Sequence, residues 1–381
     1  MKVHRVSNPT RDDWNRFVTA QPGATICQAY EWGEIRRAHG WEPHYVALER
    51  GGEWIAAALI LTKRLPAGLG TILYSPRGPM VTEQEGAAPA LAEAVSLVAR
   101  TCGGLFWRVE PPVQGEDSFL TSELAKAGFI RVAQEWSYWN RPKYEMQLNV
   151  AAGEAAVFAK LGSKIRTKIR HASKRGVVID EGCGEQDIES FYRLLKNTGT
   201  KKRIPVRGLD YFHTLYRTLI KSGMARLFLA RKDSIPVAGG LSVRYGSMAT
   251  LLYLSNDYSM QRAGWAVQWE MLRWAIAQGC STYDFGGTGT SYPPQETDKG
   301  YGVYQFKHSF GAQILQWYGY ADYVFRPVSY RAFRLIEQQL PYGERMFLEW
   351  PNRLLHRWRR NASHVDAPVQ AASGRHDVEE S

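Results

Sequence analysis

The chain has 381 residues, 44% hydrophobic and 22% charged, a composition that predicts a globular protein with room for two domains and excludes a wholly disordered chain. Its 48 Lys and Arg against 37 Asp and Glu give a net charge of +11, which favours an anionic partner: nucleic acid, a nucleotide-linked precursor or an anionic membrane surface. The four cysteines are scattered and lack close histidines, so we expect neither a disulfide framework nor a metal site. Because no apolar leader and no apolar run of roughly 20 residues is present, we expect a cytoplasmic protein.

The first half of the chain combines several strand patterns with one helical pattern. The helix is predicted over residues 86–100, between the third and fourth strands. The strands are predicted over residues 45–48, 55–61, 71–74 and 106–109, with a further strand over 144–148. This order of elements predicts a mixed α/β (α+β) architecture.

A strongly basic helix is predicted from Ser163 to Gly176, with Leu161, Ile165, Ile169 and Ala172 on its apolar face. Five cations flank that face: Lys164, Arg166, Lys168, Arg170 and Lys174. No acidic residue between Lys160 and Ile179 balances them. This charge density suits phosphate groups, whose binding is driven by counterion release; a solvated helix face is the alternative. We favour the functional interpretation, with tRNA or precursor phosphate as the ligand.

A second basic cluster, Lys201-Lys202-Arg203 with Arg207, follows a helix predicted over residues 188–197. The planar fork of an arginine can hold a diphosphate, so Arg203 is the first candidate for such a contact and Arg207 the second. Strands are then predicted over 225–230, 237–243 and 248–254. The order of elements seen in the first half is thereby repeated.

The segment from Gln261 to Ala266 connects the last of these strands to the next helix. It resembles the pyrophosphate loop by which GNAT acyltransferases hold acetyl-CoA at a helix N-terminus. This short pattern supports a GNAT-like fold and keeps an acyl-CoA-dependent function open.

A glycine-rich loop follows a strand predicted over residues 281–285. Its glycines at positions 286, 287 and 289 can leave ordinary backbone space and let amide groups approach a ligand closely. An alternating run over residues 302–306 predicts a second strand, which would deliver Lys307 between Phe306 and Phe310. The pattern is equally compatible with a surface hairpin bearing a solvated lysine and with a substrate cradle.

The chain changes character beyond Tyr342. Residues 345–360 interleave arginines with Trp350, Leu354, Leu355 and Trp358, as a basic amphipathic segment on anionic lipid would. The pattern favours the alternative, a terminal helix packed on the first domain with its arginines in water. Residues 361–381 are predicted to form a disordered tail.

Three motifs in order resemble the C-terminal signature of the FemABX family: Asp284 to Gly287, Gly302 to Gly311, and Tyr318 to Asp322. FemABX proteins are peptidoglycan bridge-forming aminoacyltransferases that move an amino acid from aminoacyl-tRNA to the stem peptide of a cell-wall precursor. The resemblance implies two tandem GNAT-like modules, residues 1–149 with about 317–360, and residues 150–316. No heptad pattern for a coiled-coil arm occurs between residues 160 and 242, so the chain is similar to the shorter, armless FemX type.

The resemblance also implies roles for individual residues. Lys307 would be the cation at the ester oxygen or the tRNA 3′ end, held by the packing of Phe306. Glu110, at a strand end before Pro111, would hold or deprotonate the acceptor amine. Arg36, together with Arg203 or Arg207, would contact precursor phosphate. Weaker candidates for substrate contact are Tyr253, Asp284, Gly286 and Gly287, and the cations of the Ser163–Gly176 helix would bind tRNA.

The predicted function is therefore aminoacyl-tRNA-dependent transfer of an amino acid to a nucleotide-linked (UDP-MurNAc-pentapeptide) or lipid-linked (lipid II) precursor. Aminoacyl-tRNA is the co-substrate, and no cofactor is expected because the ester is already activated. An acyl-CoA N-acyltransferase is one alternative. A non-enzymatic protein that binds RNA or an anionic membrane is another, and peripheral attachment at the inner face of the plasma membrane is compatible with either class.

Overall fold

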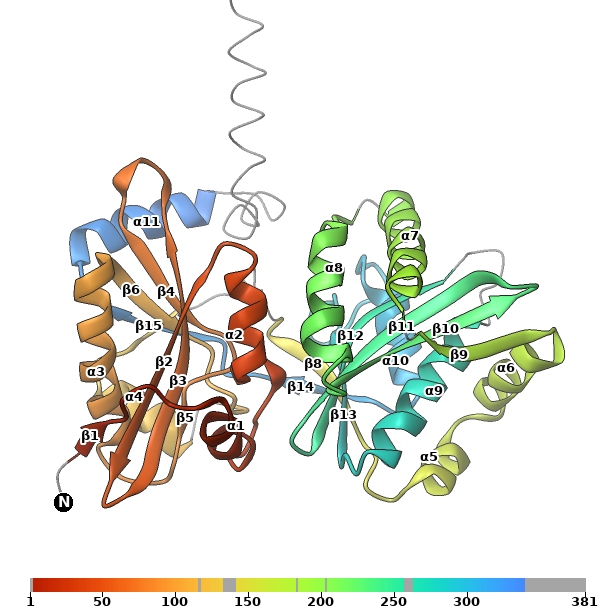
Figure 1. Ribbon diagram of the computed structural model, residues 1–381, viewed down its shortest axis with the longest axis horizontal. Coiled ribbons are helices and arrows are strands. Elements are labelled where there is room, and N and C mark those ends of the chain that lie inside the picture. The colour runs from red at the N-terminus through yellow and green to blue at the C-terminus, as the bar shows by residue number, and fades with distance from the viewer. Residues whose placement is uncertain are drawn as a thin grey trace, which may run out of the picture.

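The computed structural model describes residues 3–115, 118–132, 142–182, 184–202, 204–256 and 263–339. Two α/β modules lie side by side, each built on one twisted sheet with helices packed against it (Figure 1). The mixed α/β class and the two-module architecture predicted from the sequence are both confirmed. The basic segment 345–360, for which a packed terminal helix was favoured over a membrane-associated segment, and the predicted tail (361–381) lie outside the described residues.

The first sheet has the strand order β1-β2-β3-β4-β6-β15-β7, with β5 paired to β3. Its strands are β1 (Val3–Arg5), β2 (Glu42–Arg50), β3 (Glu53–Arg64), β4 (Thr71–Ser75), β5 (Met80–Val81), β6 (Gly104–Val109), β7 (Ile130–Val132) and β15 (Tyr320–Val324). Its helices are α1 (Arg11–Thr19), α2 (Tyr30–Arg37), α3 (Ala87–Cys102), α4 (Phe119–Lys126) and α11 (Pro327–Gln339). The chain returns to this sheet at β15, which inserts between β6 and β7.

The second sheet has the order β14-β8-β13-β12-β11-β10-β9. Its strands are β8 (Tyr144–Asn149), β9 (Val177–Gly182), β10 (Ala225–Lys232), β11 (Ile235–Tyr245), β12 (Met248–Asn256), β13 (Thr282–Gly287) and β14 (Gln313–Gln316). Its helices are α5 (Glu154–Lys160), α6 (Ser163–Lys174), α7 (Glu185–Lys202), α8 (Leu209–Leu215), the π-helical turn Tyr216–Ile220, α9 (Ala263–Ala277) and α10 (Tyr301–His308).

The two sheets repeat one arrangement. Each contains a parallel pair joined by a long helix, β4 and β6 through α3 in the first module, and β12 and β13 through α9 in the second. Helix α3 illustrates the local cause: its apolar stripe, including Leu91 and Val95, is fully buried, and Gly103 ends it in the left-handed conformation at φ +71°. Both sheets are therefore built from the same helix-on-strand packing.

One predicted element and one predicted module boundary differ from the structure. Residues 302–306 are part of helix α10 instead of a strand, because Tyr304, Lys307 and Phe310 face inward at a spacing of three, which is helical, while Val303 is exposed. Strand β8, assigned to the first module by the predicted division at residue 149, pairs with β13 and β14 of the second sheet. The alternating pattern predicted β8 as a strand but not its long-range partners.

The modules share a buried interface. A single core cluster contains Trp14 and Ile35 of the first module and Phe191, Phe212 and Leu219 of the second. The Tyr245 hydroxyl donates to Asn15 Oδ1 across this boundary at 2.8 Å. Helix α2 contacts the π-helical turn Tyr216–Ile220, which continues α8, at this junction in the centre of Figure 1. Contacts of this kind fix the geometry of a site that draws residues from both modules.

Candidate active site between the two modules

Lys307 and the glycine-rich loop, predicted together, do meet in the structure. The Lys307 side chain is 6% exposed, and its Nζ donates to the Gly287 carbonyl oxygen at 2.6 Å. Helix α10, not a strand end, brings the lysine to this position. A buried ammonium held at the exit of β13 can place positive charge where a reacting oxygen would sit.

Backbone geometry explains why glycines occupy positions 286 and 287. Gly286 has φ +72°, and its N–H donates to Asp284 Oδ1 at 2.7 Å. A Cβ on Gly287 would lie 2.3 Å from Pro142 Cγ, so a larger residue would displace the chain that enters β8. Asp284 is buried, and its hydrogen bond to the Gly286 N–H holds the turn of the loop in place.

Aromatic packing connects α10 to the basic helix α6. The Trp265 ring, in the first turn of α9, stacks on Phe310 at 5.4 Å and lies 4.6 Å from Phe306. The ammonium of Lys168 sits over the same indole at 4.0 Å. Phe306 therefore packs against Trp265, and the predicted phosphate-binding helix adjoins the lysine site. Of the Gln261–Ala266 loop, only residues 263–266 are described.

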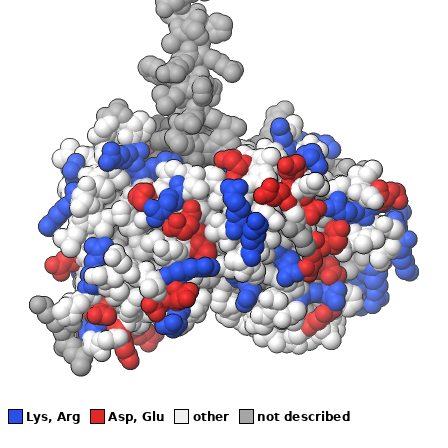
Figure 2. All heavy atoms as spheres, in the orientation of Figure 1, with Lys and Arg blue, Asp and Glu red and all other residues white. Residues whose placement is uncertain are grey.

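The other cations of α6 differ in their surroundings: one is hydrogen-bonded to nearby backbone, and three are exposed to solvent. Arg166 donates to the carbonyl oxygens of Ala159 and Leu161, at 2.9 and 2.7 Å, and so connects α6 to α5. Lys164, Arg170 and Lys174 are exposed, while the apolar face of the helix is turned inward. Figure 2 shows this basic surface as blue spheres along the right-hand edge of the second module.

Glu110 lies in the first module at the end of β6 and is fully buried. Its carboxylate accepts hydrogen bonds from the Tyr74 hydroxyl at 2.8 Å and from the Arg77 N–H at 3.3 Å. Burial raises the pKa of Glu110, although Arg77 and the hydroxyls of Tyr74 and Tyr320 oppose the shift. Burial also raises the pKa of Tyr74 well above its usual range, which keeps this phenol a donor.

Arg77 is a site residue that the sequence analysis missed. Its guanidinium donates to the Pro142 carbonyl oxygen at 2.9 Å, pairs with Glu145 at 2.9 Å, and lies 4.5 Å from the Trp317 ring centre. Trp317 Nε1 donates to the same Glu145 oxygen at 2.7 Å. A recognisable signal was present in Pro76-Arg-Gly-Pro79, an arginine held in a proline-bounded turn.

These contacts join the two predicted catalytic residues. Arg77 touches Glu110 through its backbone N–H and Pro142 through its guanidinium. Pro142 packs on Gly287, whose carbonyl oxygen receives the Lys307 ammonium. A continuous run of contacts, through the half-buried Pro142 and Gly287, thus extends from the carboxylate of one module to the lysine of the other.

Two of the predicted phosphate-binding arginines, Arg36 and Arg207, lie near the module boundary, where the His39 ring of the first module packs 5.0 Å from the Tyr211 ring of the second. Arg36 is buried with its guanidinium 5.2 Å from the Trp41 ring centre, and the Lys63 ammonium lies 5.1 Å from that ring. Arg207 lies over Tyr211 at 4.6 Å. Burial lowers the pKa of His39; the Asp210 carboxylate, 3.8 Å from the ring, opposes this shift, and the charges of Arg207 and Arg36 add to it. Arg203 lies outside the described residues.

Tyr253 lies on β12, its ring 5.1 Å from Phe212, so it packs in the core shared by the modules.

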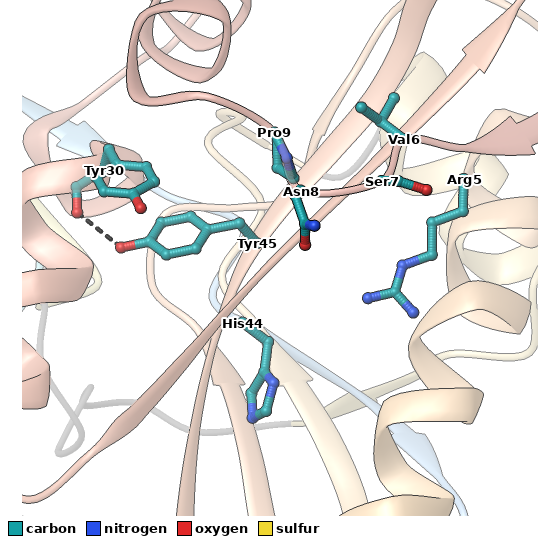
Figure 3. Close-up of a pocket in the computed structure, with 8 residues that line it drawn as sticks. All are labelled: Arg5, Val6, Ser7, Asn8, Pro9, Tyr30, His44 and Tyr45. Carbon is teal, nitrogen blue, oxygen red and sulfur yellow. Dashed lines mark hydrogen bonds between the residues drawn. The ribbon is translucent and has the colours of Figure 1, made fainter.

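A separate hollow of about 570 Å³ opens on the first module beside the stacked rings of Tyr30 and Tyr45 (Figure 3). It is lined by Arg5, Val6, Ser7, Asn8, Pro9, Tyr30, His44 and Tyr45. None of the predicted site residues lines it.

Replacing Glu110 with glutamine is expected to change the pH profile of the enzyme. If the ionised carboxylate holds the acceptor amine, kcat/KM falls as the pH drops through the Glu110 pKa, which burial raises above 4.5. The acid limb of the wild-type profile should therefore lie above that value, and the Glu110→Gln variant should lack it. Glu296→Gln, at an exposed position of the glycine-rich segment, is the control and should keep the wild-type limb. An unchanged acid limb in Glu110→Gln would remove Glu110 from this role.

Within the described residues, no group of three or more His, Cys, Asp or Glu is arranged to hold a metal ion. None of the helices described here is long and apolar enough to span a bilayer.

Comparison with known proteins supports the same architecture. The FemAB family model matches residues 10–231, and an acetyltransferase (GNAT) domain model matches residues 159–307. Lipid II:glycine glycyltransferases of Staphylococcus haemolyticus (strain JCSC1435) and Staphylococcus aureus (strain USA300) are 25% and 23% identical to the chain. These alignments cover 88% and 87% of this chain and 95% of each relative.

Solved structures show the same fold. The crystal structure of FemX matches with a TM-score of 0.79 at 21% identity, covering 88% of this chain and 100% of FemX. A tandem GNAT protein from the clavulanic acid biosynthesis pathway matches with a TM-score of 0.52 at 11% identity, covering 85% and 98%. The fold is therefore two tandem GNAT-like modules. Because the FemAB model matches more than half of the residues, this chain belongs to the FemAB family.

Proposed function

We propose that this protein transfers an amino acid from aminoacyl-tRNA to a free amine on the stem peptide of a lipid-linked peptidoglycan precursor, and so builds the interpeptide bridge. The observation that carries the proposal is the buried Lys307 ammonium on the Gly287 carbonyl, joined by contacts through Arg77 to the Glu110 carboxylate. Family membership and relatives named lipid II:glycine glycyltransferases support the acyltransferase class and the lipid-linked acceptor.

The proposed chemistry is aminolysis of an ester. The neutral amine attacks the ester carbonyl carbon, a C–N bond forms, and the C–O bond to the tRNA ribose breaks. Lys307 stabilises the negative charge that develops on oxygen, and the proton lost from the amine passes by way of Glu110 to the departing ribose hydroxyl. The activated ester supplies the driving force, so the step needs no metal or redox cofactor.

Binding of the two substrates is assigned to different surfaces. The exposed cations Lys164, Arg170 and Lys174 of α6 lie beside the lysine site and suit the phosphates of a tRNA acceptor end. Lys168, over Trp265, lies between that surface and α10. Arg36 and Arg207, which approach His39 from the two modules, suit the diphosphate of the precursor.

The reaction places the protein in the cytoplasm, where charged tRNA is found, at the inner face of the membrane that holds the acceptor. The test is to incubate the protein with labelled aminoacyl-tRNA and lipid-linked precursor and to look for label on the stem peptide. Parallel reactions with nucleotide-linked precursor and with labelled acetyl-CoA distinguish a soluble acceptor and an acyl-CoA-dependent activity. Binding of tRNA with no transfer of label from either aminoacyl-tRNA or acetyl-CoA would leave only the non-enzymatic alternative.

A further inference from the structure

One end of the first module exposes four aliphatic side chains. Leu69, Val328, Leu335 and Ile336 are 53%, 82%, 65% and 48% exposed. Leu69 lies in the connection between β3 and β4, and the others lie on α11. The two segments meet at Leu105: the Gly70 Cα packs beside the Leu105 side chain, and the Arg326 N–H donates to the Leu105 carbonyl oxygen at 3.0 Å. Figure 1 shows both segments at the upper end of this module.

The orientation of α11 is fixed from its opposite face. Arg108, fully buried on β6, donates to both oxygens of Asp322 at 2.8 Å and to Glu337 Oε1 at 2.5 Å. The Tyr330 hydroxyl donates to Asp322, and Phe333 is buried. Val328 and Leu335 are seven residues apart, which is about two helical turns, so they share the outward face. The aliphatic side chains are therefore exposed by a firmly held helix.

The same end of the module is basic. Four arginines are exposed on the segments that form this end: Arg64 at the end of β3, Arg100 in the last turn of α3, Arg326 just before α11 and Arg331 on α11. Arg64 pairs with Thr71 in the sheet, and the Thr71 hydroxyl donates to the Cys102 carbonyl oxygen at the end of α3 at 2.6 Å. The Arg326 N–H donates to Leu105, three residues further along the chain, so both arginines belong to this end of the module. No Asp or Glu occurs in residues 64–71, 99–106 or 324–336. Blue and white spheres line the upper left edge of this module in Figure 2.

We propose that this surface, the α11 face with Leu69 and its four arginines, docks on an anionic lipid surface. Aliphatic side chains gain free energy by entering the boundary between headgroups and acyl chains, and arginines are attracted to anionic headgroups. RNA would match the arginines but not the aliphatic side chains, because single-stranded and duplex RNA are bound through phosphates, stacking and base edges. Docking would hold the enzyme where a lipid-linked acceptor lies, and in this respect the inference rests on the proposed function.

The test measures binding of the full chain to vesicles. Vesicles of phosphatidylcholine with roughly one-third phosphatidylglycerol should bind the protein, and pure phosphatidylcholine vesicles should bind it far less. The triple variant Val328→Ser/Leu335→Ser/Ile336→Ser should bind about tenfold or more weakly. Arg64→Gln/Arg326→Gln/Arg331→Gln should bind about a hundredfold more weakly, since each arginine near the surface contributes about fivefold.

A matched control comes from the second module, where Val178 and Ile235 are 66% and 65% exposed on β9 and β11. Acidic residues Asp180, Glu181 and Asp233 lie close to them in sequence. Val178→Ser/Ile235→Ser should therefore bind the anionic vesicles as the wild type does. Transfer to lipid-linked precursor dissolved in detergent, where no vesicle surface is present, should be unchanged in every variant. Absence of that transfer in the wild type would count against the proposed function, whereas vesicle binding tests the docking surface alone.

Three results would overturn the proposal. The α11 and arginine variants could bind anionic vesicles as tightly as the wild type, which would assign any membrane binding to another part of the chain. The variants could lose tRNA affinity in proportion to vesicle affinity, which would make this an RNA surface. The wild type could form a dimer that the serine variant cannot, which would identify the occupant as a second copy.

Discussion

Replacing Lys307 with alanine is expected to lower kcat for aminoacyl transfer by about 100- to 1000-fold, the usual effect of removing one preorganised group that stabilises a developing oxyanion. The Lys307 ammonium is buried and held by the Gly287 carbonyl, so no solvent cation can easily replace it. The free energy of unfolding should fall by only about 1–3 kcal/mol, the cost of leaving one buried carbonyl without its donor. Rapid-mixing transfer assays and urea denaturation measure the two effects separately.

Lys299→Ala is the control for this variant. Lys299 is exposed and belongs to the same glycine-rich segment, so its removal changes the net charge equally without touching the Gly287 carbonyl. It should keep the wild-type kcat. Full activity in Lys307→Ala, or an equal loss in both variants, would exclude Lys307 as the cation at the reacting oxygen.

Replacing Arg77 with alanine is expected to reduce both stability and transfer. The guanidinium is buried between Glu145, Pro142 and Trp317, and deleting one partner of a buried ion pair costs about 3–5 kcal/mol. Because Pro142 packs on Gly287, the loop that receives Lys307 should also lose its support. We therefore expect kcat to fall even at temperatures where the variant is fully folded. Arg77→Lys, which keeps the charge but loses the planar fork, should fall between the wild type and the alanine variant.

Arg16→Ala gives the matched control, since Arg16 also forms an ion pair but is 75% exposed. It should cost less than about 1 kcal/mol and leave kcat unchanged. A double-mutant cycle between Arg77→Ala and Glu145→Gln separates the ion pair from general damage, because direct neighbours should show a coupling of about 0.5–3 kcal/mol. If kcat per folded molecule in Arg77→Ala equals that of the wild type, Arg77 stabilises the fold but does not position the site.

The parts of the site that the sequence predicted involve residues that are close together along the chain. Gly286, Gly287 and Lys307 lie in two successive motifs, with Lys307 only 20 positions after Gly287, so a short stretch of chain is enough to predict that they lie together. The same stretch misled the element assignment, because a five-residue alternation from Gly302 to Phe306 cannot be distinguished from one face of a short helix. Element existence was therefore predicted better than element type.

The parts that were missed depend on pairing between distant segments. Arg77 acquires its role from Glu145 and Trp317, which lie far along the chain and arrive through β8 and the return of the chain to the first sheet. Likewise, the Arg108–Asp322 pair that orients α11 joins residues separated by 214 positions. No periodicity in the sequence encodes such pairs, because each strand pattern specifies which face is buried but not which strand lies beside it.

The most direct test of the proposed function is reconstituted transfer. Purified protein, labelled aminoacyl-tRNA and lipid-linked precursor in detergent or vesicles should yield a stem peptide that carries the label in an amide bond stable to mild alkali, and Lys307→Ala should yield almost none. Label that appears from acetyl-CoA but not from aminoacyl-tRNA, or tRNA that is bound without deacylation in the presence of precursor, would contradict the assignment as an aminoacyltransferase.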